Sequence, residues 1–240
     1  MELNPRIKIS DSKLKESKII LGSFPTWSLS ISEDKEINKE KERARIENKE
    51  VPFFFGSSIN KFWNWYNKYV DNKVVKNDVK SIKNSLKTNK IGITDLIFSC
   101  KRKEKSSLDK HLTKRNYNHS FFQLPKNGET LKILCTSKGV MNEMLLNKKF
   151  FKTHSELQIN LKKSLEFQNI ITRKTHGNSN YIRNPFCLLI ETKCGGKIEC
   201  VSIPSPGSPH RRLIDFGLDS KDSNQFLDNY LKVVFDWLIE

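Results

Sequence analysis

The sequence has no apolar run long enough to span a bilayer, and its first residues, MELNPRIKIS, lack the apolar stretch of a secretory signal. Both absences favour a cytoplasmic protein without a membrane partner. Cysteine pairs in CxxC spacing are also missing, which argues against a zinc ribbon or an iron–sulfur cluster. We therefore expect no metal, no cofactor and free, mostly buried thiols. The five cysteines are Cys100, Cys135, Cys187, Cys194 and Cys200.

Acidic residues are few relative to basic ones. Lys and Arg number 43 against 27 Asp and Glu, which gives a net charge of +16. A field of this size attracts polyanions and speeds encounter with them, so nucleic acid is the expected partner. The alternative is a composition rich in Lys and Asn that serves no specific ligand. The 240 residues suffice for one domain with a sizeable core, and we expect a monomer.

Apolar runs that end in Gly and Pro turns predict strands. The segment 18–25 (KIILGSFP) is a short run of this kind, and 130–140 (TLKILCTSKGV) is a second, followed by a short helix at about 141–146. Residues 186–206 read as two strands joined by a Gly-Gly turn, running into a Pro-rich loop. The segment 90–100 (KIGITDLIFSC) reads as buried, and 101–112 as a polar loop with a helix start.

Helical spacing of apolar residues predicts the helices. One predicted helix starts at Asn60, and three others cover 74–88, 151–170 and 224–239. The charged stretch 32–50 has little apolar periodicity, which indicates a solvated helix or a mobile loop inserted into the domain.

Alternating strands and helices predict one three-layer α/β/α sandwich over residues 1–240, built around a mainly parallel sheet. Ligands of such sheets sit beyond the carboxyl ends of the strands. The loops GSFP, CTSKG and IPSPGSPHRR all follow predicted strands, so we expect them at that edge.

Three segments carry a resemblance to a known family. They are GSFPTWS (22–28), FFFGSSINKFW (53–63) and VSIPSPGSPHRR (201–212), and their order along the chain matters more than any one motif. Together they resemble the uracil-DNA glycosylase superfamily, nearest to its mismatch-specific and hypoxanthine-type branches. In those branches a G-x-x-P loop is followed by an aromatic residue and by Asn-x-Phe-Trp at the start of a helix. The stretch 92–109 (GITDLIFSCKRKEKSSLD) is also similar.

The resemblance implies the fold given above and a monofunctional DNA glycosylase that uses water as the nucleophile. It places the flipped base near Gly22, Ser23, Phe24 and Phe55, and it makes Asn60 a catalytic candidate. It also implies a DNA-contacting loop, whose candidate residues are Ser205, Pro206, Ser208, His210, Arg211 and Arg212.

Each candidate has a plainer interpretation. Phe55 fits an aromatic platform for a flipped base, because every base offers a π-face, but Phe53, Phe54 and Phe55 also suit a core. Asn60 suits water or base binding, and equally a helix N-cap. Asp95, polar inside an apolar run, is a candidate for electrostatic stabilisation of the transition state, or else a turn cap or an ion-pair partner.

The sequence departs from the family at Phe24, where many members place the Asn or Asp that activates water. Either Asn60 or an acid such as Asp95 would then take that role. The sequence does not identify the base, and candidates include uracil, hypoxanthine, mismatched thymine and a modified base from phage DNA. Phe24 also suits a second hypothesis, a non-catalytic DNA-binding protein on the same fold. A metal-dependent nuclease needs clustered acids that Asp95 and Glu191 do not provide.

Overall fold

The computed structural model describes residues 1–7, 13–105, 109–119, 121–146, 151–152, 154–176, 186–209, 213 and 223–240. Within these ranges the chain forms a six-stranded sheet of order β4-β2-β7-β10-β9-β8 and a four-stranded sheet of order β3-β1-β5-β6. The protein is therefore α/β, as its sequence predicts.

The six-stranded sheet carries the parallel strands that the sequence predicts at its centre. Strands β4, β2, β7 and β10 run parallel to one another, whereas β9 is antiparallel to both β10 and β8. The strands are β2 (Lys18–Gly22), β4 (Ile91–Asp95), β7 (Thr130–Cys135), β8 (Leu157–Ile159), β9 (Cys187–Thr192) and β10 (Lys197–Ser202).

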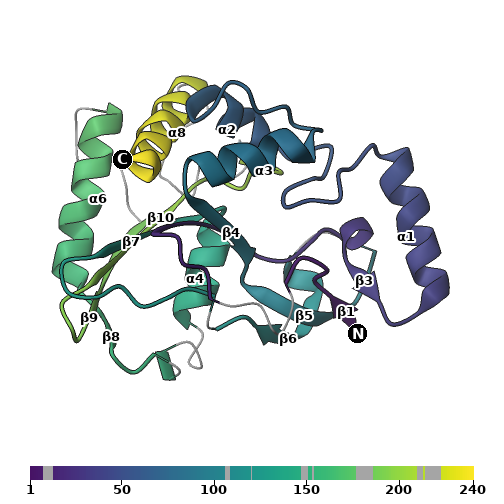
Figure 1. Cartoon of the computed structure of the whole chain (residues 1–240), viewed down its shortest axis with the longest axis horizontal. Coiled ribbons are helices and arrows are strands. Elements are labelled where there is room, and N and C mark those ends of the chain that lie inside the picture. The colour runs from purple at the N-terminus through teal and green to yellow at the C-terminus, as the bar shows by residue number, and fades with distance from the viewer. Residues whose placement is uncertain are drawn as a thin grey trace.

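Helices cover both faces of this sheet (Figure 1). The alternation of side chains along β2 shows why: Ile20 packs into the core on one face, and Ile19 and Leu21 pack into the core on the other. One face carries α2 (Phe62–Tyr69), α3 (Val79–Thr88), α6 (Leu161–His176) and α8 (Ser223–Ile239), and the opposite face carries α4 (Lys138–Leu146).

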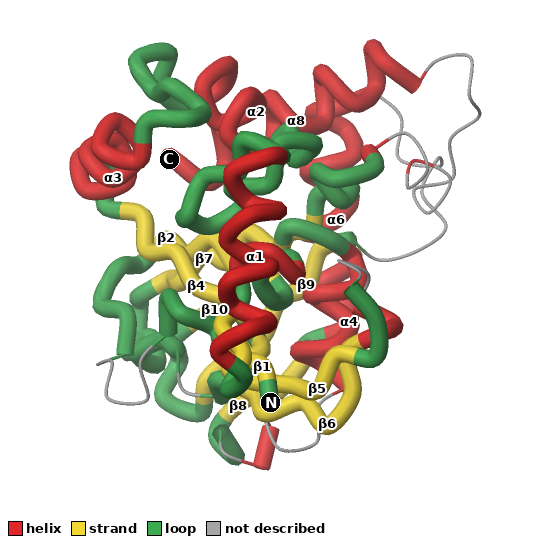
Figure 2. The backbone as a smooth tube through the Cα atoms, turned by 90° about the vertical axis from the view of Figure 1, so that its right-hand side faces the viewer, coloured by secondary structure: helices red, strands yellow, loops and turns green. Residues whose placement is uncertain are grey.

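The four-stranded sheet lies beside the carboxyl end of β4. It consists of β1 (Glu2–Leu3), β3 (Ile31–Ser32), β5 (Ile97–Arg102) and β6 (Leu112–Tyr117). The charged stretch 32–50 forms α1 (Lys35–Glu47), which crosses the face shown in Figure 2. Asp34 caps this helix by accepting hydrogen bonds from the backbone of Glu36 and Ile37.

The sequence predicts most of these elements but not the small sheet. The buried segment 90–100 is two strands in two sheets, because Leu96 separates β4 from β5. The helix start expected within 101–112 is wrong: the 3₁₀ turn Asp109–His111 leads into β6 instead. The helix expected over 151–170 begins at Leu161, because β8 occupies 157–159. The short strands β1, β3 and β8 are too brief to show a period of two.

A buried ionic cluster ties the N-terminus to the rest of the small sheet. The Glu2 carboxylate accepts hydrogen bonds from Arg102 Nε at 2.7 Å, Lys41 Nζ at 2.9 Å and Ser30 Oγ at 3.0 Å. Burial alone would raise the pKa of Glu2, but the hydrogen bonds from Arg102 and Lys41 outweigh it and lower that pKa. Glu2 therefore stabilises the fold above the carboxyl's unfolded pKa, and this contribution is lost as pH falls through the lowered value.

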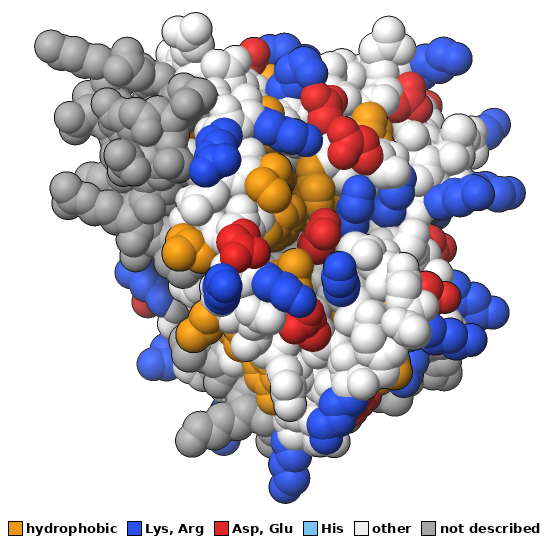
Figure 3. Space-filling view, turned by 90° about the vertical axis from the view of Figure 1, so that its left-hand side faces the viewer, with side chains coloured by type: hydrophobic (Ala, Val, Ile, Leu, Met, Phe, Trp, Pro, Cys, Tyr) orange, Lys and Arg blue, Asp and Glu red, His pale blue; other side chains and the backbone are white. Residues whose placement is uncertain are grey.

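The surface mixes charges of both signs. On the face seen in Figure 3, Lys and Arg side chains lie among acidic ones and around a group of apolar side chains. Large apolar residues exposed on α6 include Leu161, Leu165 and Ile170. Over the described residues, no helix combines the length and the apolar character that a membrane crossing requires.

Replacing Glu2 should destabilise the protein strongly. In Glu2→Gln, Lys41 and Arg102 stay buried without their counterion, and breaking a buried ion pair costs about 3–5 kcal/mol. Urea denaturation would measure the loss. The matched control is Glu36→Gln, which breaks the exposed pair with Lys39 and should change the unfolding free energy by less than about 1 kcal/mol. Equal losses in the two variants would contradict this account.

Candidate functional site

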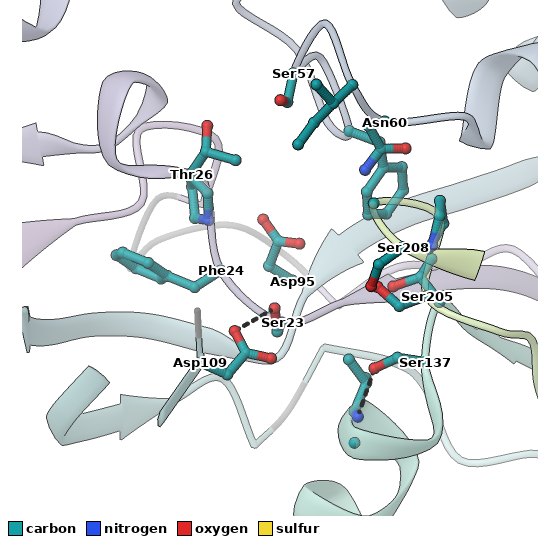
Figure 4. A pocket seen from close by; sticks show the side chains of 18 of the residues that line it. Ser23, Phe24, Thr26, Ser57, Asn60, Asp95, Asp109, Ser137, Ser205 and Ser208 are labelled. Carbon is teal, nitrogen blue, oxygen red and sulfur yellow. Dashed lines mark hydrogen bonds between the residues drawn. The ribbon is translucent and has the colours of Figure 1, made fainter. Parts of the chain in front are cut away.

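A cavity of about 600 Å³ opens at the carboxyl ends of β2, β4, β7 and β10. The three segments that carry the family resemblance all line it, together with the loop after β7 (Figure 4). The parallel strands explain this convergence, because each delivers its following loop to the same edge. The edge predicted from the sequence is therefore where the cavity lies.

Phe55 lies against the end of β2. A Cβ built on Gly22 would come within 2.9 Å of Phe55 Cε1, so glycine is needed for the ring to approach the strand. The ring also packs on Phe62, with 4.6 Å between centroids. Phe55 has a positive φ of 55°, a backbone conformation that bulky residues rarely adopt and that clusters at functional sites. Its neighbours Phe53 and Phe54 are buried in the core.

The loop that carries Phe55 is closed by its own backbone. Val51 donates its N–H to the carbonyl of Gly56 at 2.8 Å, and Trp63 donates its indole N–H to the carbonyl of Phe54 at 2.7 Å. A Cβ on Gly56 would meet the Val51 carbonyl oxygen at 1.9 Å. This loop therefore holds the Phe55 ring at the cavity with little room for rearrangement.

Asn60 lies one residue before Lys61, the N-cap of α2, and both binds the first turn of that helix and faces the cavity. Its side-chain oxygen accepts a hydrogen bond from the Phe62 N–H at 2.9 Å, just at the start of α2. The side chain is half-buried and lines the cavity, and its amide nitrogen has no hydrogen-bond partner within the described part of the chain. The oxygen is thus engaged by the helix, whereas the N–H₂ group is left to donate into the cavity.

Asp95 ends β4 at the floor of the cavity and is almost fully buried, with 2% of its surface exposed. Asn4 donates a hydrogen bond to it at 2.9 Å, and Arg6 lies 3.8 Å away. Burial raises the pKa of Asp95, and the Arg6 charge and the Asn4 hydrogen bond oppose that effect. Arg6 is itself largely buried, and its Nη2 has no hydrogen-bond partner among the residues that the structure describes.

A second carboxyl group enters the cavity from the 3₁₀ turn before β6. Asp109 accepts a hydrogen bond from Ser23 Oγ at 3.1 Å, as drawn in Figure 4. Burial raises the pKa of Asp109, and the nearby Glu143 raises it further, against the effects of the Ser23 hydrogen bond, Arg115 and Arg102.

The Pro-Ser loop, residues 203–209 after β10, forms the opposite wall. Ser205, Pro206 and Ser208 line the cavity, and the Ser208 N–H closes a turn onto the Ser205 carbonyl at 3.0 Å. The Pro206 carbonyl accepts the Lys61 N–H at 3.1 Å, which joins this loop to the start of α2. His210, Arg211 and Arg212, expected to contact DNA, lie outside the described residues.

Phe24 lines the cavity but belongs equally to the small sheet. Its ring packs near Ile97, Cys100 and Leu112, and the Arg102 guanidinium lies 5.6 Å from the ring centroid. In Figure 4 the ring points away from Asn60 and Ser205. Phe24 thus makes an apolar contact between the loop after β2 and the small sheet, at the position where the resemblance implied a polar residue.

Sequence reasoning missed several residues that line the cavity. Arg6 comes from the N-terminal segment. Asn4, which also binds Asp95, comes near it through the pairing of β1 with β5, which the sequence does not reveal. Asp109 lay within a stretch noted for its likeness to the family but was not singled out. Ser137, which accepts the Val140 N–H at 3.1 Å and so caps α4, could have been found from its place directly before a helix.

The cavity offers donors, acceptors and one aromatic face rather than a set of metal ligands. No group of three or more His, Cys, Asp or Glu side chains in the described ranges is arranged to hold a metal ion. Its carboxyl groups each have protein partners: Asp95 with Asn4 and Arg6, and Asp109 with Ser23.

Gly22→Ala should disrupt the site. The new Cβ would lie 2.1 Å from Asp95 Oδ1 and 2.9 Å from Phe55, so both side chains must move. Overpacking of this kind costs about 1–3 kcal/mol, which thermal unfolding would measure. The control is Gly207→Ala in the Pro-Ser loop, where a Cβ meets nothing within 4 Å and where we expect a change below about 0.5 kcal/mol. A Gly22→Ala protein as stable as this control would refute the close packing described.

Comparison with known proteins gives no match: no protein-family model, no curated protein and no solved structure matches the chain.

Proposed function

We propose that the protein is a monofunctional DNA glycosylase, which flips a damaged, mismatched or modified base out of DNA and hydrolyses its N-glycosidic bond. The observation that carries the proposal is the meeting of Phe55, Asn60 and the Pro-Ser loop around one cavity at the carboxyl edge of a parallel sheet. The resemblance of these three segments to the uracil-DNA glycosylase superfamily implies a role for each. Phe55 stacks on the flipped base, Asn60 binds water or the base, and the Pro-Ser loop contacts DNA.

The cavity suits a flipped base. Its volume of about 600 Å³ accommodates a nucleoside, and the Phe55 ring supplies a face for stacking. Phe55 rests on Gly22 and Phe62, so little freedom is lost when a base stacks on it. Ser23, Thr26 and Ser57 also line the cavity, and their hydroxyl groups are available to a base edge.

The same cavity suits hydrolysis at the sugar. The transition state resembles an oxocarbenium ion, so a preset carboxylate and a preset donor lower its energy. The Asn60 amide holds the attacking water or the leaving base, and Asp95 stabilises positive charge on the sugar. In this scheme Asn60 activates water, a role that many members of that superfamily give to an Asn or Asp at the position of Phe24.

The Pro-Ser loop suits the DNA backbone. Ser205 and Ser208 carry hydroxyl groups beside the cavity mouth, and hydroxyl and backbone N–H groups are common phosphate ligands. Lys110 and Lys138 also line the cavity, and neither is ion-paired with any residue that the structure describes. A chain of net charge +16 supplies the long-range attraction.

A non-catalytic DNA-binding protein is the second candidate, and two observations favour it. Phe24 packs against the small sheet and has no group with which to activate water. The side-chain oxygen of Asn60 is already occupied by the Phe62 N–H. The two candidates differ in whether abasic sites form.

The first test incubates the protein, with EDTA present, with duplexes that carry uracil, hypoxanthine, a G·T mismatch or a modified cytosine. Alkali then cleaves any abasic site. We expect cleavage at one of these bases, unchanged when Mg²⁺ replaces EDTA. Intact strands on every duplex, with tight binding retained, would support the DNA-binding protein. Cleavage only with Mg²⁺ would indicate a nuclease.

Variants of Asn60 separate its two roles. Asn60→Ser keeps an acceptor for the Phe62 N–H, whereas Asn60→Ala loses it and should cost about 1 kcal/mol of stability. Both variants lose the amide donor, so we expect single-turnover excision to fall by about 100- to 1000-fold in each. An Asn60→Ser protein with full activity would show that Asn60 acts only as a cap.

Variants of Phe55 test the stacking platform. Phe55→Ala should weaken binding of DNA that contains the target base by about 1–3 kcal/mol, whereas its effect on undamaged DNA should be small. Phe55→Tyr keeps the ring and is the matched control. Fluorescence anisotropy with both duplexes measures the difference. Equal weakening on damaged and undamaged DNA would argue against a stacked base.

A further inference from the structure

We propose that Asp109 is a further catalytic residue: it donates a proton to the leaving base, so the substrates are bases that depart poorly as anions. This inference rests on the proposed glycosylase function. It concerns a residue to which neither the sequence nor the family resemblance assigns a role.

The geometry places Asp109 for this task. One carboxyl oxygen accepts the Ser23 hydroxyl at 3.1 Å, and Ser23 directly follows Gly22, on which the Phe55 ring lies. The other oxygen has no hydrogen-bond partner among the described residues, and Figure 4 shows it directed toward the cavity. The backbone of Asp109 is fixed, because its carbonyl accepts a hydrogen bond from Arg115. A base stacked on Phe55 therefore lies within reach of a fixed carboxyl group.

The two carboxyl groups of the cavity have different surroundings. Burial raises the pKa of both acids, and at Asp95 the Arg6 guanidinium and the Asn4 amide donor oppose this effect. At Asp109 the opposing hydrogen bond comes from a neutral hydroxyl, Ser23, and the carboxylate of Glu143 adds to the effect of burial. Pairs of acids whose environments differ in this way commonly divide the roles of charge stabiliser and proton donor.

Charged groups on the elements around Asp109 shift the pKa of its carboxyl group. Glu143 on α4 and Asp95 on β4 disfavour its ionisation, and Arg102 on β5 and Arg115 on β6 favour it. Burial is the largest effect and raises the pKa of Asp109, in the direction that a general acid near neutral pH requires.

The proposed step balances as a hydrolysis. The bond between C1′ and the base nitrogen breaks, and its electron pair goes to the base. The proton of Asp109 goes to an acceptor nitrogen or oxygen of that base, which leaves neutral. Water adds to C1′ and loses a proton to solvent, and Asp109 regains its proton from solvent. No metal, oxidant or reductant takes part.

Leaving-group pairs provide the test. One pair is hypoxanthine and N7-methylhypoxanthine, whose fixed positive charge lets it leave without a proton. The other is uracil and 5-fluorouracil, whose fluorine makes it the better leaving group. Single-turnover excision is measured for the wild-type protein, for Asp109→Asn, which keeps an acceptor for Ser23, and for Asp34→Asn, a matched change at the exposed cap of α1. Thermal unfolding checks that each variant is folded.

We expect Asp109→Asn to slow the poorer leaving group of the active pair by about 100- to 10,000-fold, the range of general acid catalysis, and the better one much less. The wild-type rate should fall as pH rises through the pKa of Asp109, and this limb should vanish in Asp109→Asn. Asp34→Asn should match the wild type. Equal losses on both members of the pair would overturn the role of Asp109 alone. A wild-type protein that excises none of these four bases, and neither mismatched thymine nor modified cytosine in the first test, would overturn the glycosylase proposal and this one together.

Discussion

The cavity depends on the anchoring of the N-terminal strand by the Glu2 carboxylate. Through Glu2, β1 is tied to Lys41 of α1, to Arg102 of β5 and to Ser30 at the end of the first loop. Two residues further on, Asn4 reaches the carboxyl group of Asp95. The residues that directly follow this anchored strand therefore hold Asp95 at the floor of the site. Because Arg102 also donates to the Pro25 carbonyl at 2.8 Å, the same cluster sets the course of the loop after β2.

Features that depend on nearby residues could be predicted from the sequence. The strands before GSFP, CTSKG and IPSP, the hairpin of β9 and β10, and the helix at the C-terminus all follow from apolar runs and Gly or Pro turns. The edge at which the loops gather follows from the parallel order of the strands. Ser205 is expected at the cavity for this reason, whereas Phe55 and Asn60 are expected there from family likeness, on which the chemical roles of all three also rest.

Features that depend on distant pairing could not be predicted. Two-residue strands such as β1 carry no periodicity, so neither the small sheet nor the approach of Asn4 and Arg6 to Asp95 could be inferred. A Lys-rich helix gives no sign that Lys41 is buried, since only its partner Glu2 explains that burial. Asp109 is similar, because its meeting with Ser23 requires β5 and β6 to fold back beside β2.

The single residue between β4 and β5 has a mechanical consequence. Asp95 ends the large sheet and Ile97 begins the small one, and the backbone N–H groups of Leu96 and Ile97 bind the carbonyls of Gly22 and Ser23 at 2.8 and 2.9 Å. These two hydrogen bonds fix the backbone at Leu96, so the connection between the two sheets is rigid. Phe24 lines the cavity and packs on the small sheet, whereas Phe55 lines it and packs on Gly22, the last residue of β2 in the large sheet. The cavity therefore takes its lining from both sheets, and the hydrogen-bonded junction at Leu96 holds these two parts of the lining together.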